Sequence, residues 1–227
     1  MPVKPHIPQF HAWSYSRLSA WEDCPLRAKL KLLDRRPEPE GPALARGNDI
    51  HKKAEKFASG QVRSLPQELG LFKDEFKDLK KAKPLLEQQW AFTRDWEPCD
   101  WFGKEAWLRV VCDAVRVEPP KATVIDHKTG KIRHGYQDQV ELFALATLAK
   151  YQDINEVETQ LWYLDHGLII PEAPEEWIFR REDEKKLRTK WEKRSKPMLL
   201  DKTFAPRPGG HCRWCHFSAS KQGLCKY

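Results

Sequence analysis

The sequence contains no run of about 18 apolar residues, the minimum length for a helix that crosses a membrane. Its opening stretch, MPVKPHIPQFHAW, includes no apolar segment long enough for the core of a signal peptide. No internal repeat is visible either. We therefore expect a soluble protein that stays in the cytoplasm and has no membrane partner.

The composition excludes intrinsic disorder for most of the chain. Of the 227 residues 40% are hydrophobic, and ten tryptophans with ten phenylalanines can fill a sizeable core. This length indicates a single domain. Lysine and arginine exceed aspartate and glutamate by 40 − 33 = 7 residues, and the isoelectric point is about 9.0, which favours a polyanionic partner such as nucleic acid.

The chain has six cysteines, which in a reducing compartment are better explained as metal ligands or buried thiols than as disulfides. Cys212 and Cys215 form a C-x-x-C pair, a spacing that presents two thiolates to one metal ion or cluster. Cys225 lies nearby in the same segment, so one ligand remains to be found. Cys24 is the best distant candidate, because the proline that follows places it at a helix junction. The alternatives are His211 and His216.

The middle of the sequence predicts a β-hairpin. Residues 107–117 alternate between apolar and polar side chains, as a half-buried strand does. Residues 118–121 contain two consecutive prolines and form a turn that cannot continue a strand ladder. Residues 122–127 are a second run rich in β-branched side chains.

Three charged side chains lie on this hairpin. Asp113 belongs to its first strand, and Asp126 and Lys128 belong to its second. Because residues two apart on a strand share a face, Asp126 and Lys128 point to the same side of the sheet. Two carboxylates at a sheet edge, with a lysine as a neighbouring point charge, predict a site for a hard divalent cation.

Other helices and strands surround the hairpin. A helix starts at Ser14 and is interrupted at Cys24. Further helices are expected over residues 43–58, around 69–79, over 136–151 and over 183–196, with strands over 85–92, 157–165 and 175–180. The helix over 136–151 has a predicted buried stripe of Val140, Phe143, Ala144, Leu148 and Tyr151. We expect the lysines of residues 73–83 to form a solvated face, with a track for phosphates as the alternative.

Four stretches, ARGNDIH, VCDAV, VIDHKTGK and QVELFALA, follow one another as in the RecB-like branch of the PD-(D/E)XK nuclease superfamily, which the chain resembles. Cys24 and Pro25, together with the three C-terminal cysteines, resemble the iron–sulfur subgroup of that branch. The subgroup includes AddB-type and CRISPR-associated RecB-like exonucleases. The resemblance extends from about Ser14 to Cys225.

The resemblance implies a role for each matching residue. His51, Asp113 and Asp126 would ligate a catalytic Mg²⁺ or Mn²⁺, with the backbone carbonyl of His127 beside them. Lys128 would orient the attacking water and stabilise the charged transition state. The remaining implied residues are Gln139 and Glu87 of the active site, and Cys24, Cys212, Cys215 and Cys225 as ligands of a [4Fe-4S] cluster, or of Zn²⁺ as the alternative.

The implied fold is an α/β (α+β) fold with a restriction-endonuclease-like core. Its mixed central sheet would have four or five strands flanked by helices, and a cysteine cluster would join the N- and C-terminal parts. We expect one nuclease domain over residues 1–227. Its parts are an N-terminal helical part (14–42), the nuclease core (43–200) and a cysteine-rich segment (201–227).

The expected function is metal-dependent exonuclease activity on DNA, with single-stranded ends preferred, in recombination, repair or CRISPR-type processing in a bacterium or virus. One alternative is a non-catalytic DNA-binding or recombination-assembly factor with a structural zinc or cluster. The other is a structure-specific endonuclease on the same core. The intact Asp126 and Lys128 argue against the non-catalytic alternative.

Overall fold

The computed structural model describes residues 9–132 and 135–227. The chain forms two compact units, which are described separately below. The larger unit is Gly41–Thr189, and the smaller unit combines Met1–Glu40 with Lys190–Tyr227. The organisation as a single nuclease domain with three parts stays a prediction.

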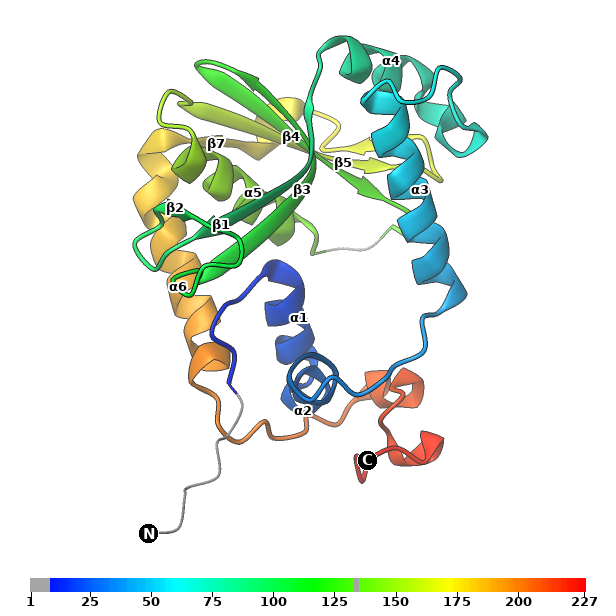
Figure 1. Ribbon diagram of the computed structural model, residues 1–227, viewed down its shortest axis with the longest axis vertical. Coiled ribbons are helices and arrows are strands. Elements are labelled where there is room, and N and C mark those ends of the chain that lie inside the picture. The colour runs from blue at the N-terminus through cyan, green and yellow to red at the C-terminus, as the bar shows by residue number, and fades with distance from the viewer. Residues whose placement is uncertain (1–8, 133–134) are drawn as a thin grey trace. The chain divides into compact units, whose positions relative to one another are not determined.

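A mixed sheet of seven strands forms the centre of the larger unit, in the order β2-β1-β3-β4-β5-β6, with β7 paired to β5 (Figure 1). The β1–β3 and β3–β4 pairs are antiparallel, whereas β4 and β5 run parallel. The strands are β1 (Leu85–Phe92), β2 (Pro98–Cys99), β3 (Leu108–Glu118), β4 (Lys121–Lys128), β5 (Glu156–Tyr163), β6 (Leu168–Ile170) and β7 (Ile178–Arg180). The predicted mixed sheet flanked by helices is confirmed.

Two predictions about the strands are wrong. The sheet has seven strands and not four or five, because β2, β6 and β7 are only two or three residues long and too short to show an alternation pattern. The predicted strand over 175–180 is a 3-10 turn, η3 (Pro174–Trp177), followed by β7. A proline at the start of η3 has the fixed φ that suits the first position of a helical turn.

The β3–β4 hairpin forms as the sequence predicts. Pro119 and Pro120 lie in the turn, and Ala114 pairs with Ile125 in the antiparallel register. From β4 the chain passes through helix α5 (Gln137–Lys150) and returns as β5, parallel to β4. A parallel neighbour requires such a crossover, which carries the chain over one face of the sheet.

Helix α5 is buried on more sides than predicted. In addition to the expected Val140, Phe143, Ala144 and Leu148, the helix buries Leu142 and the residues from Leu145 to Ala149. The predicted one-sided stripe is therefore wrong, and Tyr151 ends the helix as its C-cap. A crossover helix that is apolar all round belongs in a core and not on a surface.

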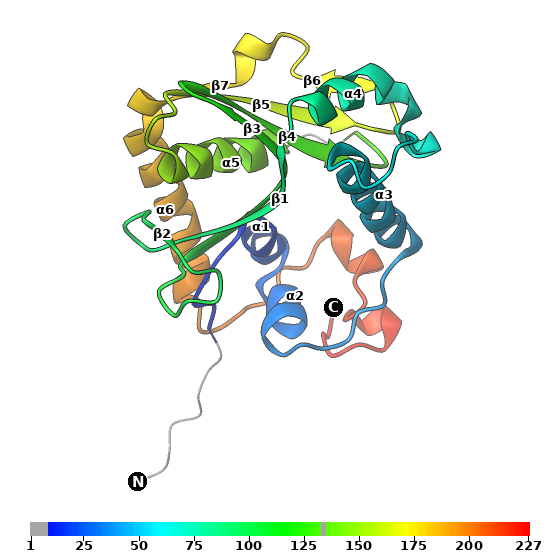
Figure 2. The same cartoon turned by 45° about the horizontal axis from the view of Figure 1, so that its top comes forward.

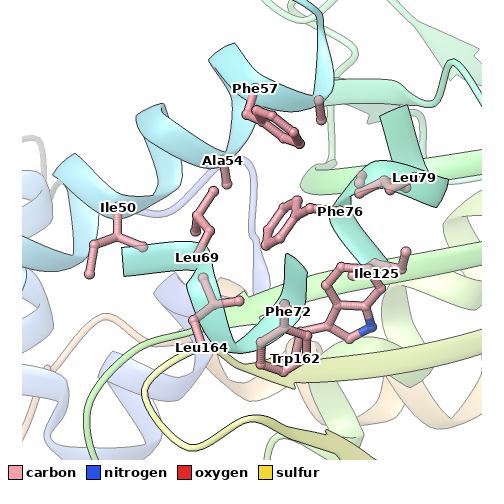
Figure 3. Close-up of a cluster of buried hydrophobic side chains, with 12 residues drawn as sticks. Ile50, Ala54, Phe57, Leu69, Phe72, Phe76, Leu79, Ile125, Trp162 and Leu164 are labelled. Atoms are coloured by element: carbon pink, nitrogen blue, oxygen red, sulfur yellow. The ribbon is translucent and has the colours of Figure 1, made fainter. Parts of the chain in front are cut away.

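Helices α3 (Pro42–Ala58) and α4 (Lys73–Lys81), with the 3-10 helix η2 (Gln67–Phe72), cover the other face of the sheet (Figure 2). Successive side chains of a strand point to opposite faces of the sheet. On β5, Trp162 packs on the face covered by α3 and α4, whereas its neighbours Leu161 and Tyr163 pack with Val140 of α5. Phe76 of α4 lies at the centre of the first cluster (Figure 3).

The smaller unit begins with α1 (Tyr15–Asp23), whose N-cap Ser14 accepts a hydrogen bond from the backbone of Arg17. Cys24 ends α1 and directly precedes α2 (Pro25–Ala28), which confirms the predicted interruption. The π-helix η1 (Lys29–Leu33) follows α2. Helix α6 (Glu184–Leu200) begins in the larger unit and contributes Trp191 to the smaller one, where its ring stacks on Trp13 at 5.9 Å.

No helix among the described residues has the length and apolarity to span a bilayer.

Truncation of Phe76 should destabilise the larger unit, because its ring is fully buried and contacts the rings of Phe57 and Trp162. We predict that Phe76→Ala lowers the free energy of unfolding by about 3–5 kcal/mol, because it leaves a cavity that neighbours fill only in part. Urea denaturation measures the loss. The matched control is Leu71→Ala, which removes a side chain that is 64% exposed and should change stability by less than about 0.5 kcal/mol.

Candidate active site

Asp113 on β3 is the centre of the candidate site. Its Oδ2 accepts a hydrogen bond of 2.7 Å from the backbone N–H of His127 on β4 and lies 3.4 Å from Nδ1 of His51 on α3. The Nδ1 atom of His127 is 3.9 Å from the same oxygen. His51, Asp113 and His127 each offer a ligand atom, and these three atoms lie within 4.8 Å of one another. Carboxylate and imidazole are both common ligands of divalent cations, so this donor set fits a metal ion.

The charges of His51 and Asp113 are coupled. Burial alone would raise the pKa of Asp113, but the hydrogen bond and charge of His51, together with His127, hold that pKa below its usual value. Burial alone would lower the pKa of His51, yet the same contact with Asp113 raises it. The contact therefore favours the charged forms of both groups, and a cation bound at Asp113 would oppose protonation of His51.

Asp126, Lys128 and Gln139 form a closed triangle on the α5 side of β4. Nζ of Lys128 lies 2.6 Å from Oδ2 of Asp126 and donates a hydrogen bond of 2.9 Å to Oε1 of Gln139. The amide of Gln139 donates in turn to Oδ1 of Asp126 at 3.2 Å. Burial raises the pKa of Asp126 to about 6, although the ammonium of Lys128 opposes that rise. The ring of Tyr136 lies 4.2 Å from the same ammonium and limits its movement further.

His127 points away from that triangle into the aromatic cluster on the other face. Its ring contacts Phe76 at 5.3 Å and Trp162 at 5.7 Å, measured between centroids. Burial lowers the pKa of His127 to about 4, so its imidazole is neutral at neutral pH. The ring thus places no second positive charge beside His51.

Glu87 joins the site from β1 in an unusual conformation. The pairs of Leu86 with Ala114 and Gln88 with Cys112 place Glu87 opposite Asp113. Its φ of 47° lies in the left-handed region, which is disfavoured for a residue with a side chain. Burial, followed by the charge of Asp113, raises the pKa of Glu87 to about 7. A strained acidic residue with a perturbed pKa is typical of a functional site.

A model of the PD-(D/E)XK nuclease superfamily matches residues 12–220. The chain belongs to this superfamily. Among solved structures it is similar to one described as "Crystal structure of SSO0001", with 14% sequence identity, a TM-score of 0.50, and coverage of 94% of this chain and 87% of that chain. At this identity the likeness concerns the fold alone. No curated protein matches the sequence.

Membership of the PD-(D/E)XK nuclease superfamily implies a metal-dependent hydrolase of phosphodiester bonds with DNA as its substrate. The superfamily assignment made from the four sequence stretches is therefore confirmed. The RecB-like branch, the roles of individual residues and the identity of the metal stay predictions. The structure brings His51, Glu87, Asp113, Asp126, His127, Lys128 and Gln139 together within the larger unit.

Sequence reasoning missed a second set of contacts beside the nuclease site. Arg46 on α3 binds Asp165 through two hydrogen bonds of 2.6 and 2.9 Å, and Asp165 also accepts the backbone N–H of Gly130 at 2.6 Å. The contact with Arg46 lowers the pKa of Asp165 to about 2. A Cβ atom on Gly47 would approach Thr129 to 3.1 Å, so the glycine permits α3 to pass close to the end of β4. The signal available in the sequence is that Arg46 and Gly130 lie within two of the matched stretches, ARGNDIH and VIDHKTGK, whereas Asp165 follows β5 without any motif.

The four predicted cluster cysteines line one pocket of the smaller unit, with about 340 Å³ of space free of atoms. Backbone N–H groups of Arg207 and Gly209 donate to the sulfurs of Cys24 and Cys212 at 3.5 and 3.4 Å. Arg27 and Arg207 also line the pocket, and no aspartate or glutamate is among the lining residues that the structure describes. Four thiols, amide donors and cations suit an anionic thiolate-bound centre.

Metal-free protein should be destabilised by the carboxylate of Glu87. Because the folded protein raises the pKa of Glu87 from 4.5 to about 7, the protonated acid contributes stability below pH 4.5 that is lost as the pH rises through 7. We predict that Glu87→Gln raises the Tm of metal-free protein at pH 8 by about 1–3 °C, a modest gain since the group is partly screened by solvent.

The difference should vanish well below pH 4.5, where the acid is protonated in both states. Thermal unfolding in the presence of a chelator measures it. Glu172→Gln is the matched control, because Glu172 is exposed and its replacement should leave the Tm unchanged. A lower Tm for Glu87→Gln at pH 8 would contradict the argument.

Proposed function

We propose that this nuclease is an exonuclease that degrades DNA from single-stranded ends with Mg²⁺ or Mn²⁺. The observation that carries the proposal is the contact of His51 on α3 with Asp113 of the β3–β4 hairpin. Asp126, which is paired with Lys128, interacts electrostatically with both. In this proposal His51, Asp113, Asp126 and the backbone carbonyl of His127 hold the ion. Carboxylates and water suit Mg²⁺ and Mn²⁺ equally well. The imidazole ligand therefore moves the preference toward Mn²⁺.

A bound divalent ion would supply an activated water and compensate the charge on the phosphate. Asp113 and Asp126 fix the ion from two neighbouring strands, so its position depends on the hairpin register. Lys128 places its ammonium next to Asp126, where it can orient the attacking water and stabilise negative charge on the phosphate. Gln139 and Tyr136 hold that ammonium in place and are therefore positioning residues.

The preference for free single-stranded ends rests on the resemblance to AddB-type and CRISPR-associated RecB-like exonucleases. A structure-specific endonuclease would use the same residues, since substrate choice depends on the channel and not on the ion. A DNA-binding factor without catalysis is the remaining alternative, and the intact Asp126–Lys128–Gln139 triangle weighs against it.

The nuclease proposal is tested with 5′- and 3′-labelled linear single-stranded DNA, linear duplex and circular single-stranded DNA, each with Mg²⁺ or Mn²⁺. We expect loss of label from the linear single strand and no attack on the circle. Asp126→Ala should reduce the rate by more than about 100-fold, because even an indirect partner of a metal ligand contributes about 10–100-fold.

Asp153→Ala is the matched control, since Asp153 is exposed and lies after α5 in the larger unit. Its rate should equal that of the wild type. Cleavage of the circular strand, which has no end, would show that the protein is an endonuclease and not the proposed exonuclease. Binding of DNA without cleavage by either ion would favour the non-catalytic factor.

We also propose that Cys24, Cys212, Cys215 and Cys225 bind a [4Fe-4S] cluster with a structural role, which would join the first helices to the C-terminal segment. The four cysteines line one pocket together with Arg27 and Arg207, and cationic neighbours suit an anionic thiolate-bound cluster.

Anaerobically purified protein should therefore contain iron and sulfide and absorb broadly near ~400 nm. Cys24→Ser should lose most of the iron, because it removes one of four ligands. Cys99→Ser is the control, since Cys99 lies in the larger unit and outside the pocket. Colourless protein with one equivalent of zinc would establish the zinc alternative instead.

A further inference from the structure

A basic hollow on the larger unit has no part in the chemistry described above. It has a volume of about 520 Å³, within the range of about 300–1,000 Å³ typical of ligand sites. Five cationic side chains and two apolar ones line it, and no carboxylate does. The lining residues are Phe57, Arg63, Leu65, Lys73, Lys77, Lys80 and Lys81.

Helix α4 spaces these cations regularly. Lys73, Lys77 and Lys81 follow one another at intervals of four residues, and Lys80 lies on the same side. With a rise of 1.5 Å per residue, four residues correspond to about 6 Å along the helix. A ladder of positive charges at such intervals suits a chain of phosphate groups better than one compact ion.

Acidic neighbours do not neutralise the hollow. Asp74 and Asp78 pair with Lys77 and Lys81 at 3.0 and 2.8 Å, but their own side chains are 83% and 73% exposed and neither lines the hollow. Exposed pairs of this kind contribute little and are readily exchanged for a stronger anion. The ammonium groups are therefore available to a ligand in the hollow.

Lys80 is the most firmly placed of the cations. Its ammonium donates to the backbone carbonyl of Val62 at 3.1 Å and lies 4.5 Å from the ring centre of Phe57. Phe57 is buried in the α3–α4 core, so this contact fixes one charge against a rigid wall (Figure 3). The hollow is thus shaped by the core and not by mobile side chains alone.

The same core connects the hollow to the metal-binding residues. Phe57 follows His51 by six residues on α3, which corresponds to about 9 Å along the helix. The ring of Phe57 contacts that of Phe76 at 6.4 Å, and Phe76 contacts His127 at 5.3 Å. A strand of nucleic acid in the hollow would therefore lie within a few nucleotides of the site of hydrolysis.

We propose that this hollow binds the sugar–phosphate backbone of a nucleic-acid strand, independently of sequence, and holds it beside the metal site. The choice of nucleic acid as the polyanion rests on the proposed nuclease function. The anion-binding property itself rests only on the charges and shape of the hollow. Phosphate contacts of this kind position a strand without reading its bases.

The test measures binding of a labelled 20-nucleotide single strand by fluorescence anisotropy, with chelator present, as a function of salt. Both proteins carry Asp126→Ala to prevent cleavage, and one also carries Lys73→Gln and Lys77→Gln. We expect the added changes to weaken binding at least about 10-fold at low salt. The slope of log K against log[salt] should become shallower by about 1.4, since each phosphate contact on a single strand contributes about 0.7.

A matched control carries Lys121→Gln and Lys150→Gln, which remove the same charge. Lys121 begins β4 at the end opposite Lys128, and Lys150 ends α5 on the other face of the sheet. This control should keep the affinity and slope of Asp126→Ala alone. An equal loss in the control would show a general effect of net charge and overturn the proposal, as would an unchanged slope in the Lys73 and Lys77 variant.

Competition identifies the anion. If inorganic phosphate displaces the strand at millimolar concentration, and a dinucleotide binds as tightly as the 20-mer, the hollow is a small-anion site and the proposal fails. With Asp126 restored, the Lys73→Gln and Lys77→Gln variant should raise KM and leave kcat unchanged. If the Lys73 and Lys77 changes weaken binding but the wild type cleaves no substrate, the nuclease function is refuted and the hollow remains a nucleic-acid site.

Discussion

The crowding of three partly or fully buried carboxylates in one row of the sheet is the constraint on which the site depends. The register places Glu87 of β1 opposite Asp113 of β3, and continues that row to Asp126 of β4. Acidic groups in adjacent positions of a sheet destabilise it, and burial increases the repulsion. Burial, with the charge of Asp113 as a smaller cause, raises the pKa of Glu87 to about 7 and that of Asp126 to about 6. A fold that keeps such a row is organised to hold a cation, which removes the conflict once it is bound.

The two helical layers supply the countercharges from opposite faces. His51 approaches Asp113 from α3, whereas Gln139 of α5 holds Lys128 against Asp126. The parallel connection from β4 to β5 requires a crossover helix, and that crossover brings Gln139 within reach of β4. The positions of these charged groups thus depend on packing on both sides of one strand.

Local patterns in the sequence were sufficient to predict the hairpin, the shared face of Asp126 and Lys128, and the break at Cys24. Each of these features depends on neighbours within a few residues. The position of Glu87 opposite Asp113 depends on strand register, and its left-handed backbone has no sequence signal. The contact of Arg46 with Asp165 joins residues 119 positions apart. The shortest strands form only because β1 and β5 already present open edges.

Charge also explains why binding and hydrolysis would use separate surfaces. A row of carboxylates repels a phosphate strand until a cation is bound, so the site itself contributes little affinity in the metal-free protein. Further cations in the row, in addition to Lys128, would pair with those carboxylates and compete with the metal. Placing them on α4, around a hollow that Phe57 of α3 also lines, avoids both effects. Attraction of the strand then needs no metal, and the carboxylates remain available for the ion.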